Sequence, residues 1–218
     1  MQLKKEIVDI CRKVYAKGFV AAYDGNISAL TNNGTVLITR SGLCKGEAEE
    51  EDILEISKSG ELITGKGKIS TENKMHLFIY KNRSDVQAVI HCHPVFATAF
   101  AAAGKDLSKI VFPEVLLSLG KIHLCGYATP STDSLTESMK PYINNSWALL
   151  LQNHGAVTMG TSIRDAYYKM EKLEHTAKTT FIAELLGGAK EIPQVKIDEL
   201  LSLAEEKYGI KPDDINLT

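Results

Sequence analysis

The stretch "AVIHCHPVFATAF", residues 88–100, decides the surrounding fold, because it joins an apolar run to two histidines, a proline and a second apolar run. Residues 86–92 predict a buried strand, and residues 94–104 predict a helix that begins at a proline and ends at a glycine. Side chains two apart on a strand point to the same face of the sheet. We therefore expect His91 and His93 to project together from the strand end, with Cys92 directed the opposite way.

Strands and helices are predicted on both sides of this stretch. Residues 3–15 carry apolar side chains at helical spacing, and residues 25–68 contain short apolar segments separated by turn residues, which favours an antiparallel meander. Two apolar strands are expected within residues 147–160, broken at residues 153–155. Further helices are predicted at residues 70–83, 132–143, 162–188 and 195–209.

Length and composition indicate one domain over residues 1–218, of the α/β class (α+β type), with a mainly antiparallel central β-sheet flanked by helices. The 25 basic residues nearly balance the 27 acidic ones, so a net charge of −2 gives no general attraction to nucleic acid or to an anionic membrane. A small-molecule partner is expected instead. The four cysteines are far apart and follow no signal peptide, so we expect reduced thiols in a soluble, cytoplasmic protein.

The two histidines of the strand form a two-ligand platform for a metal ion. A catalytic zinc takes three protein ligands and keeps one position open, and His154, at the break between the second pair of strands, is the best-placed third donor. The alternative is that these are histidines of the core or surface without a metal. Structural or solvent-exposed roles are expected for the remaining histidines, which are His76, His123 and His175.

A carboxylate and three polar segments complete the candidate site. Glu72 lies early in a helix that starts at Ser70 and Thr71, where a carboxylate is favoured by the helix dipole even without a function. The segments "DGNIS", "TRSG" and "KIST" can present N–H and O–H donors to a phosphate without an arginine cluster, although each is also typical of ordinary turns.

Taken together, "YDGNIS", "TRSG", "STENKMH", "VIHCHP" and "LLLQNHGAVTMG" resemble the motifs of the class II aldolase/adducin family in order and spacing, from the first helix to near Gly188. The resemblance implies that His91, His93 and His154 hold zinc and that Glu72 is the catalytic acid/base. It also implies a phosphate-binding site made of Asn26, Ser41, Gly42, Ser70 and Thr71.

The resemblance further implies an aldolase with one Zn²⁺ per subunit, cleaving a ketose 1-phosphate to dihydroxyacetone phosphate and a short aldehyde, in a homotetramer with active sites at subunit interfaces. Such chemistry suits these residue types, because a divalent cation stabilises the enediolate that forms when a carbon beside a carbonyl loses its proton. Alternatives on the same scaffold are a pentulose-phosphate epimerase, a sugar-phosphate dehydratase and a non-catalytic adducin-like binding module.

Two positions depart from the pattern of the family's aldolases. Leu117 aligns with a tyrosine that donates a proton to the aldehyde oxygen from a neighbouring subunit, and Pro130 replaces an aromatic residue of the aldehyde pocket. A reshaped and more permissive aldehyde pocket is therefore expected. Tyr208, in the last predicted helix, is a candidate replacement donor, although packing is the commoner role of such a tyrosine.

Overall fold

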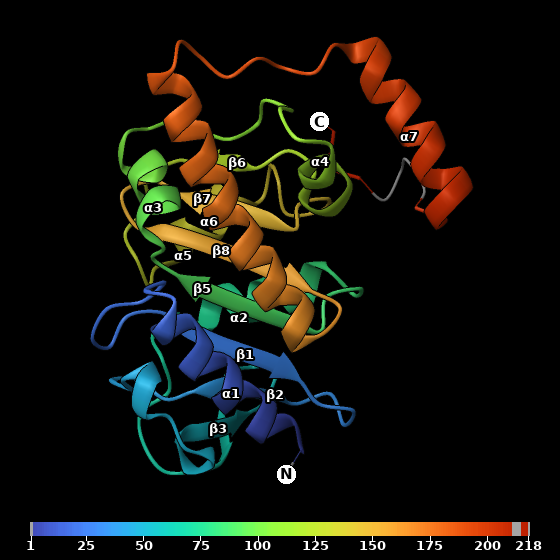
Figure 1. The fold of residues 1–218 in the computed structure, drawn as a ribbon. Helices are drawn as coiled ribbons and strands as arrows, with labels where there is room; N and C mark the ends of the chain where they lie inside the picture. The colour runs from blue at the N-terminus through green and yellow to red at the C-terminus, as the bar shows by residue number, and fades with distance from the viewer. Residues whose placement is uncertain (1, 211–214, 218) are drawn as a thin grey trace.

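The computed structural model describes residues 2–210 and 215–217, which form an eight-stranded sheet between two layers of helices (Figure 1). Every neighbouring pair of strands is antiparallel except the parallel pair at one edge. The sheet is thus mainly antiparallel, as the sequence predicted. Its strands, in order across the sheet, are β4 (Leu62–Thr64), β3 (Ile53–Ile56), β2 (Val36–Thr39), β1 (Asn26–Leu30), β5 (Ala88–Cys92), β8 (Gly155–Gly160), β7 (Ala148–Leu151) and β6 (His123–Cys125).

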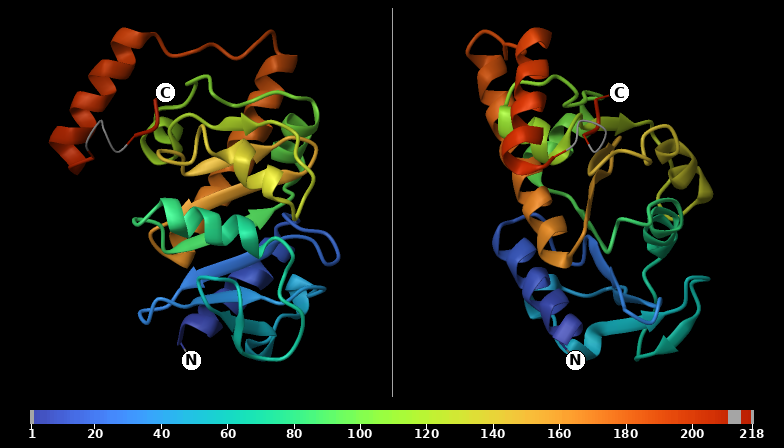
Figure 2. Two further views of the ribbon diagram at one scale, coloured as in Figure 1. Left: turned by 180° about the vertical axis from the view of Figure 1, so that it is seen from behind. Right: turned by 90° about the vertical axis from the view of Figure 1, so that its right-hand side faces the viewer.

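Helices cover both faces of the sheet, as the two further views show (Figure 2). One face carries α1 (Gln2–Ala16), α3 (Val95–Ala102) and α6 (Ile163–Leu185), whose apolar sides enclose one core cluster. The other face carries α2 (Asn73–Asn82) and α5 (Asp133–Met139) over a second cluster. Outside these layers, α4 (Pro113–Leu119) packs against α7 (Gln194–Tyr208), and two short 3-10 helices occupy Lys45–Glu47 and Glu50–Asp52.

The alternation of side chains along β1 and β5 selects the face on which polar residues gather. Ile27 on β1 and Ile90 on β5 enter the core beneath α1 and α6. Their neighbours Asn26 and His91 therefore point toward the α2 face, and the two lie opposite each other in the pairing of β1 with β5. Polar side chains thus meet in the middle of the sheet rather than at an exposed edge.

The helix predicted from residue 70 begins later, at Asn73, with Glu72 as the residue that precedes its first turn. The reason lies in the preceding turn, where the Ser70 hydroxyl accepts a hydrogen bond of 3.3 Å from the backbone N–H of Glu72. Neither α4 nor β6 was predicted from the sequence. Across the described ranges, the structure contains no helix with the length and apolar character needed to cross a bilayer.

Candidate active site

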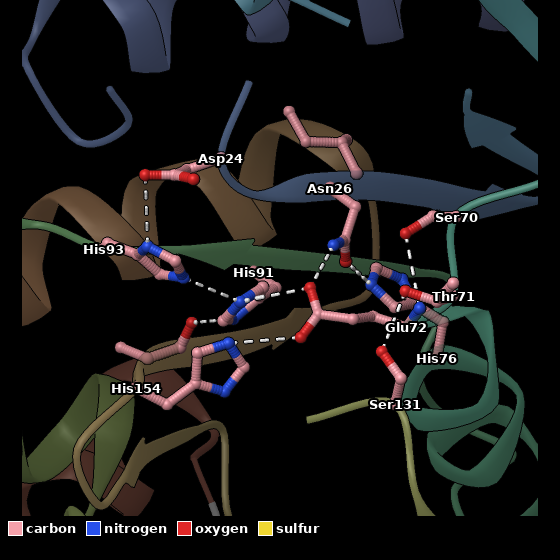
Figure 3. Close-up of polar contacts among 12 residues, drawn as sticks. Asp24, Asn26, Ser70, Thr71, Glu72, His76, His91, His93, Ser131 and His154 are labelled. Atoms are coloured by element: carbon pink, nitrogen blue, oxygen red, sulfur yellow. Dashed lines mark hydrogen bonds and ion pairs between the residues drawn. The ribbon is translucent and has the colours of Figure 1, made fainter. Parts of the chain in front are cut away.

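Three histidine rings converge at one end of β5. His91 is a residue of β5, His93 follows the strand directly, and His154 lies in the turn between β7 and β8 (Figure 3). The Nε2 atoms of His91 and His93 are 3.1 Å apart, and the ring centroid of His154 lies 4.6 Å from that of His91. One nitrogen from each ring falls within 4.8 Å of the others, so the three side chains form a group that could hold a metal ion.

The surroundings of the rings fit them to bind a cation. The Nδ1 atom of His91 donates to the backbone carbonyl of Ala156 at 2.9 Å, which leaves the lone pair of Nε2 facing the other two rings. His93 has its Nδ1 atom 3.6 Å from a carboxylate oxygen of Asp24. Burial lowers the pKa of His91, which favours the neutral ring with a free lone pair on Nε2. Three imidazoles are a donor set that suits zinc and similar divalent ions.

Glycines at two positions allow the chains to approach this closely. A Cβ atom at Gly155 would lie 2.6 Å from the carbonyl oxygen of Cys92 and would overlap the ring of His93. Gly25 has a φ of +72°, and a Cβ atom there would lie 2.7 Å from the carbonyl oxygen of His91. A larger residue at either position would therefore collide with the backbone that carries the histidines. Cys92, as predicted, lies in the opposite core beneath α1 and α6.

Glu72 is the carboxylate that faces the histidines. Its Oε2 atom accepts a hydrogen bond of 2.6 Å from the side-chain amide of Asn26 and lies 3.5 Å from Nε2 of His91. Its Oε1 atom lies 3.1 Å from Nε2 of His154. Burial opposes the charge of Glu72, but the adjacent histidines and the Asn26 amide outweigh burial and lower the pKa of this carboxyl group. The carboxyl group of Glu72, whose side chain is 14% exposed, is therefore ionised at neutral pH.

Two polar atoms in this group have no hydrogen-bond partner in the described part of the chain. They are Oε1 of Glu72 and Nδ1 of His154. Oε1 of Glu72 lies within ion-pair distance of His154, but the contact does not have hydrogen-bond geometry. Buried polar atoms are nearly always paired in folded proteins. Unpaired atoms beside three converging rings are what a site for a cation and a polar ligand would contain.

The backbone brings the predicted phosphate-binding segments to the same end of the sheet. Arg40 and Ile69 form an isolated bridge, and the N–H of Ser41 donates to the carbonyl of Lys68 at 2.8 Å. The segment that follows β2 therefore lies beside the segment that precedes α2, while Asn26 reaches Glu72 from β1. Phosphate binding stays a prediction for the set, which comprises Asn26, Ser41, Gly42, Ser70 and Thr71.

Sequence reasoning missed three residues next to this group. Ser131, between β6 and α5, donates a hydrogen bond of 2.8 Å to the hydroxyl of Thr71 and has a φ of +67°, which is uncommon for a residue other than glycine. Asp24 contacts His93, and His76 hydrogen-bonds Asn26. Nothing in the sequence marked Ser131, and Asp24 was noted only as the first residue of the segment "DGNIS". His76 stands four residues after Glu72, the spacing of neighbours on one helix face.

The positions that depart from the family pattern lie away from the histidines within one chain. Leu117 is a partly buried residue of α4 and packs against the apolar side of α7, near Ile197 and Leu201. Tyr208 ends α7, which stands apart from the sheet (Figure 1), and its side chain is exposed. A role for Tyr208 as proton donor would require a neighbouring subunit, and this role stays a prediction.

Comparisons with known proteins place the chain in a family. Residues 5–181 match the class II aldolase and adducin N-terminal domain. The chain is 38% identical over 177 residues to an L-fuculose phosphate aldolase of Methanococcus maripaludis, covering 81% of this chain and 95% of the relative. It is 33% identical over 205 residues to a 3-oxo-tetronate 4-phosphate decarboxylase of Pectobacterium atrosepticum, covering 92% of each. A solved L-fuculose 1-phosphate aldolase superposes with a TM-score of 0.87 at 26% identity, covering 94% of this chain and 97% of the other.

The chain belongs to the class II aldolase and adducin family. Relatives at similar sequence identity to this chain are named for two reactions: one is an aldolase and the other a decarboxylase, and both names include a phosphorylated sugar or sugar acid.

Proposed function

We propose that the protein is a metal-dependent aldolase that cleaves a ketose 1-phosphate, L-fuculose 1-phosphate or a related deoxyketose phosphate, to dihydroxyacetone phosphate and a short aldehyde. The observation that carries this proposal is the convergence of His91, His93 and His154 beside the partly buried carboxylate of Glu72. An adducin-like binding module has no need of such a group. We further propose one domain over residues 1–218, a cytoplasmic location and a homotetramer.

His91, His93 and His154 would hold one zinc ion per subunit, leaving room for substrate oxygens. The bound cation supplies Lewis-acid stabilisation of negative charge that develops on the ketone oxygen. The ligand set and the unpaired buried atoms beside it support this assignment.

Glu72 moves the proton at carbon. In cleavage, the hydroxyl group on the fourth carbon gives up its proton to solvent as that carbon becomes the aldehyde, and the electron pair of the bond between the third and fourth carbons stays on the third carbon. Glu72 takes up a proton from solvent and delivers it to the third carbon. In synthesis, the Glu72 carboxylate removes that proton from dihydroxyacetone phosphate. The predicted phosphate-binding residues would fix the other end of the substrate, and a reactant held in place in this way needs less activation free energy.

A decarboxylase acting on a 3-oxo sugar-acid phosphate is the second candidate. Loss of carbon dioxide from 3-oxo-tetronate 4-phosphate leaves the electron pair on the carbon beside the ketone, and protonation of that carbon gives dihydroxyacetone phosphate. This reaction releases no aldehyde, so it needs no group to exchange a proton with an aldehyde oxygen. Leu117 at the position of the tyrosine donor, and the decarboxylase relative that the chain matches over 92% of its length, favour this candidate.

One experiment separates these reactions. Purified protein supplied with zinc is incubated with L-fuculose 1-phosphate, other ketose phosphates and 3-oxo-tetronate 4-phosphate, and dihydroxyacetone phosphate, aldehyde and carbon dioxide are each measured. Aldehyde released together with dihydroxyacetone phosphate supports the aldolase, and carbon dioxide in its place supports the decarboxylase. Epimerised or dehydrated products would move those family reactions ahead. A preference for unphosphorylated sugars would contradict the proposal.

A further inference from the structure

A buried chain of hydrogen bonds runs away from Glu72 into the space between β1 and α2. The Asn26 amide donates to Glu72 at one end and receives a hydrogen bond from Nε2 of His76 at the other. Nδ1 of His76 lies 2.6 Å from the Ser28 hydroxyl, which lies 2.7 Å from the hydroxyl of Tyr80. All four side chains beyond Glu72 are at least nine-tenths buried.

Two regular elements position this chain of hydrogen bonds. Asn26 and Ser28 are two apart on β1 and point to the same face of the sheet. His76 and Tyr80 are four apart on one side of α2, facing that strand, and Glu72, four residues before His76, directly precedes the helix. Figure 3 shows the imidazole of His76 next to the Asn26 amide, on the side that faces away from His91, His93 and His154. Secondary structure therefore fixes the order of the five groups.

The chemistry of the groups fixes the direction of the hydrogen bonds. The carboxylate of Glu72 can only accept, so the NH₂ group of Asn26 must face it and the amide oxygen must face His76. His76 then carries its proton on Nε2, and its Nδ1 atom accepts from Ser28. The Ser28 oxygen is left to accept from Tyr80. Burial lowers the pKa of His76 to about 4, which agrees with a neutral ring that has one donor and one acceptor.

We propose that His76 is a positioning residue that acts through Asn26, locked in its Nε2–H form by Ser28 and Tyr80, and that it reserves Oε1 of Glu72 for proton transfer. The Asn26 amide holds Oε2 through its hydrogen bond. A flip of this amide group would place its oxygen against the carboxylate, so that two hydrogen-bond acceptors would face each other. Oε1 is the carboxylate oxygen that has no hydrogen-bond partner among the described residues. This inference rests on the proposed proton-transfer role of Glu72.

The proton form of His76 can be observed without any turnover. Long-range nitrogen–proton spectra of the protein carrying isotope-labelled histidine report which ring nitrogen bears the proton, and a His76→Gln sample assigns the signal. We expect a neutral His76 with the proton on Nε2, and that result supports the inference even if aldolase activity is absent. A proton on Nδ1, or a ring that is charged near neutral pH, would overturn the inference even if the protein proves to be an active aldolase.

Kinetics then test whether the chain of hydrogen bonds positions Glu72 or only stabilises the fold. The rate of deuterium exchange from solvent into dihydroxyacetone phosphate isolates the proton transfer at carbon. His76→Leu should lower kcat for exchange at least about tenfold with KM changed less than about twofold, because a lost hydrogen bond to a charged network is of that size. His76→Gln, which keeps a donor near Nε2, should restore most of the rate.

The near-isosteric Tyr80→Phe variant covers the case in which His76→Leu does not fold, and it should lower kcat about twofold to tenfold with KM unchanged. Tyr167→Phe is its matched control, since Tyr167 is a buried tyrosine outside this chain of hydrogen bonds, and it should leave the exchange rate unaltered. A folded, metal-containing Tyr80→Phe protein with wild-type kcat, or equal losses in Tyr80→Phe and Tyr167→Phe, would refute the positioning role.

Discussion

Glu72 has two carboxylate oxygens in different surroundings. Oε2 accepts from Asn26, while Oε1 faces His154 without a hydrogen bond. We expect Glu72→Gln to keep the fold and the metal content but to lower turnover at least about a hundredfold, the usual range for loss of a general acid/base. Deuterium exchange into dihydroxyacetone phosphate should fall together with cleavage. A metal-loaded Gln variant that retains near wild-type turnover would show that another group moves the proton.

Ser41 provides a second test at the residue scale. Ser41→Asp places a negative charge in the predicted phosphate-binding segment, so KM for phosphorylated ketoses should rise at least about fivefold, because like charges repel. Ser59→Asp is a matched control, since Ser59 is an exposed serine in the turn between β3 and β4 and the change in net charge is equal. Equal KM values for the Ser41→Asp variant and the wild type would remove Ser41 from the phosphate site.

Residue spacing was sufficient to predict that the histidines meet at the end of the strand, whereas Glu72 was selected only through the resemblance to the family. His91 and His93 share a strand face, as a period of two requires, and the sequence also predicted that Cys92 points away. The contact between Ser131 and Thr71 depends on how the loop before α5 turns back toward α2, and no local pattern encodes that path. The burial of His76 could not be predicted either, because helical spacing shows which face of a helix a residue occupies and not what packs against that face.

The turn between β7 and β8 shows what an element contributes to the site. Gly155→Ala should displace the ring of His93, because the added Cβ would overlap it. We expect the purified variant to contain less than about half the wild-type metal, as a removed or misplaced ligand weakens a metal site. Gly126→Ala is the control, since a Cβ at Gly126 meets no atom within 4 Å. Full metal content in the Gly155→Ala variant, or in His93→Ala measured beside it, would argue against the three-histidine site.

Elements were predicted best where apolar periodicity was long. The first helix, the helix of residues 163–185 and the paired strands of the meander all carry extended patterns, and the structure contains each of them. The seven-residue α4 and the three-residue β6 are too short for a period to appear, and their positions depend on packing against α7 and β7. The start of α2 shifted by three residues because the Ser70 side chain forms a turn ahead of it.

At the scale of the whole molecule, apolar side chains remain exposed along one side. Val95, Phe181 and Leu185 border a groove between α3 and the end of α6. We expect light scattering to give about four times the chain mass of 23.9 kDa, since apolar surface of this kind is commonly buried between subunits. Dilution to monomers should abolish activity if neighbouring subunits complete the site. A monomer with full activity would exclude the tetramer as a requirement.

The central place of β5 in the sheet has a consequence for the growing chain on the ribosome. Its two partners are β1, which is synthesised earlier, and β8, which is synthesised more than sixty residues later, about the length of a small domain. Until then, one side of an apolar strand has its backbone N–H and C=O groups unpaired, and such an edge can pair with other chains. The position that puts His91 between Asn26 and Val157 therefore leaves the nascent protein prone to aggregation until residue 160 has emerged.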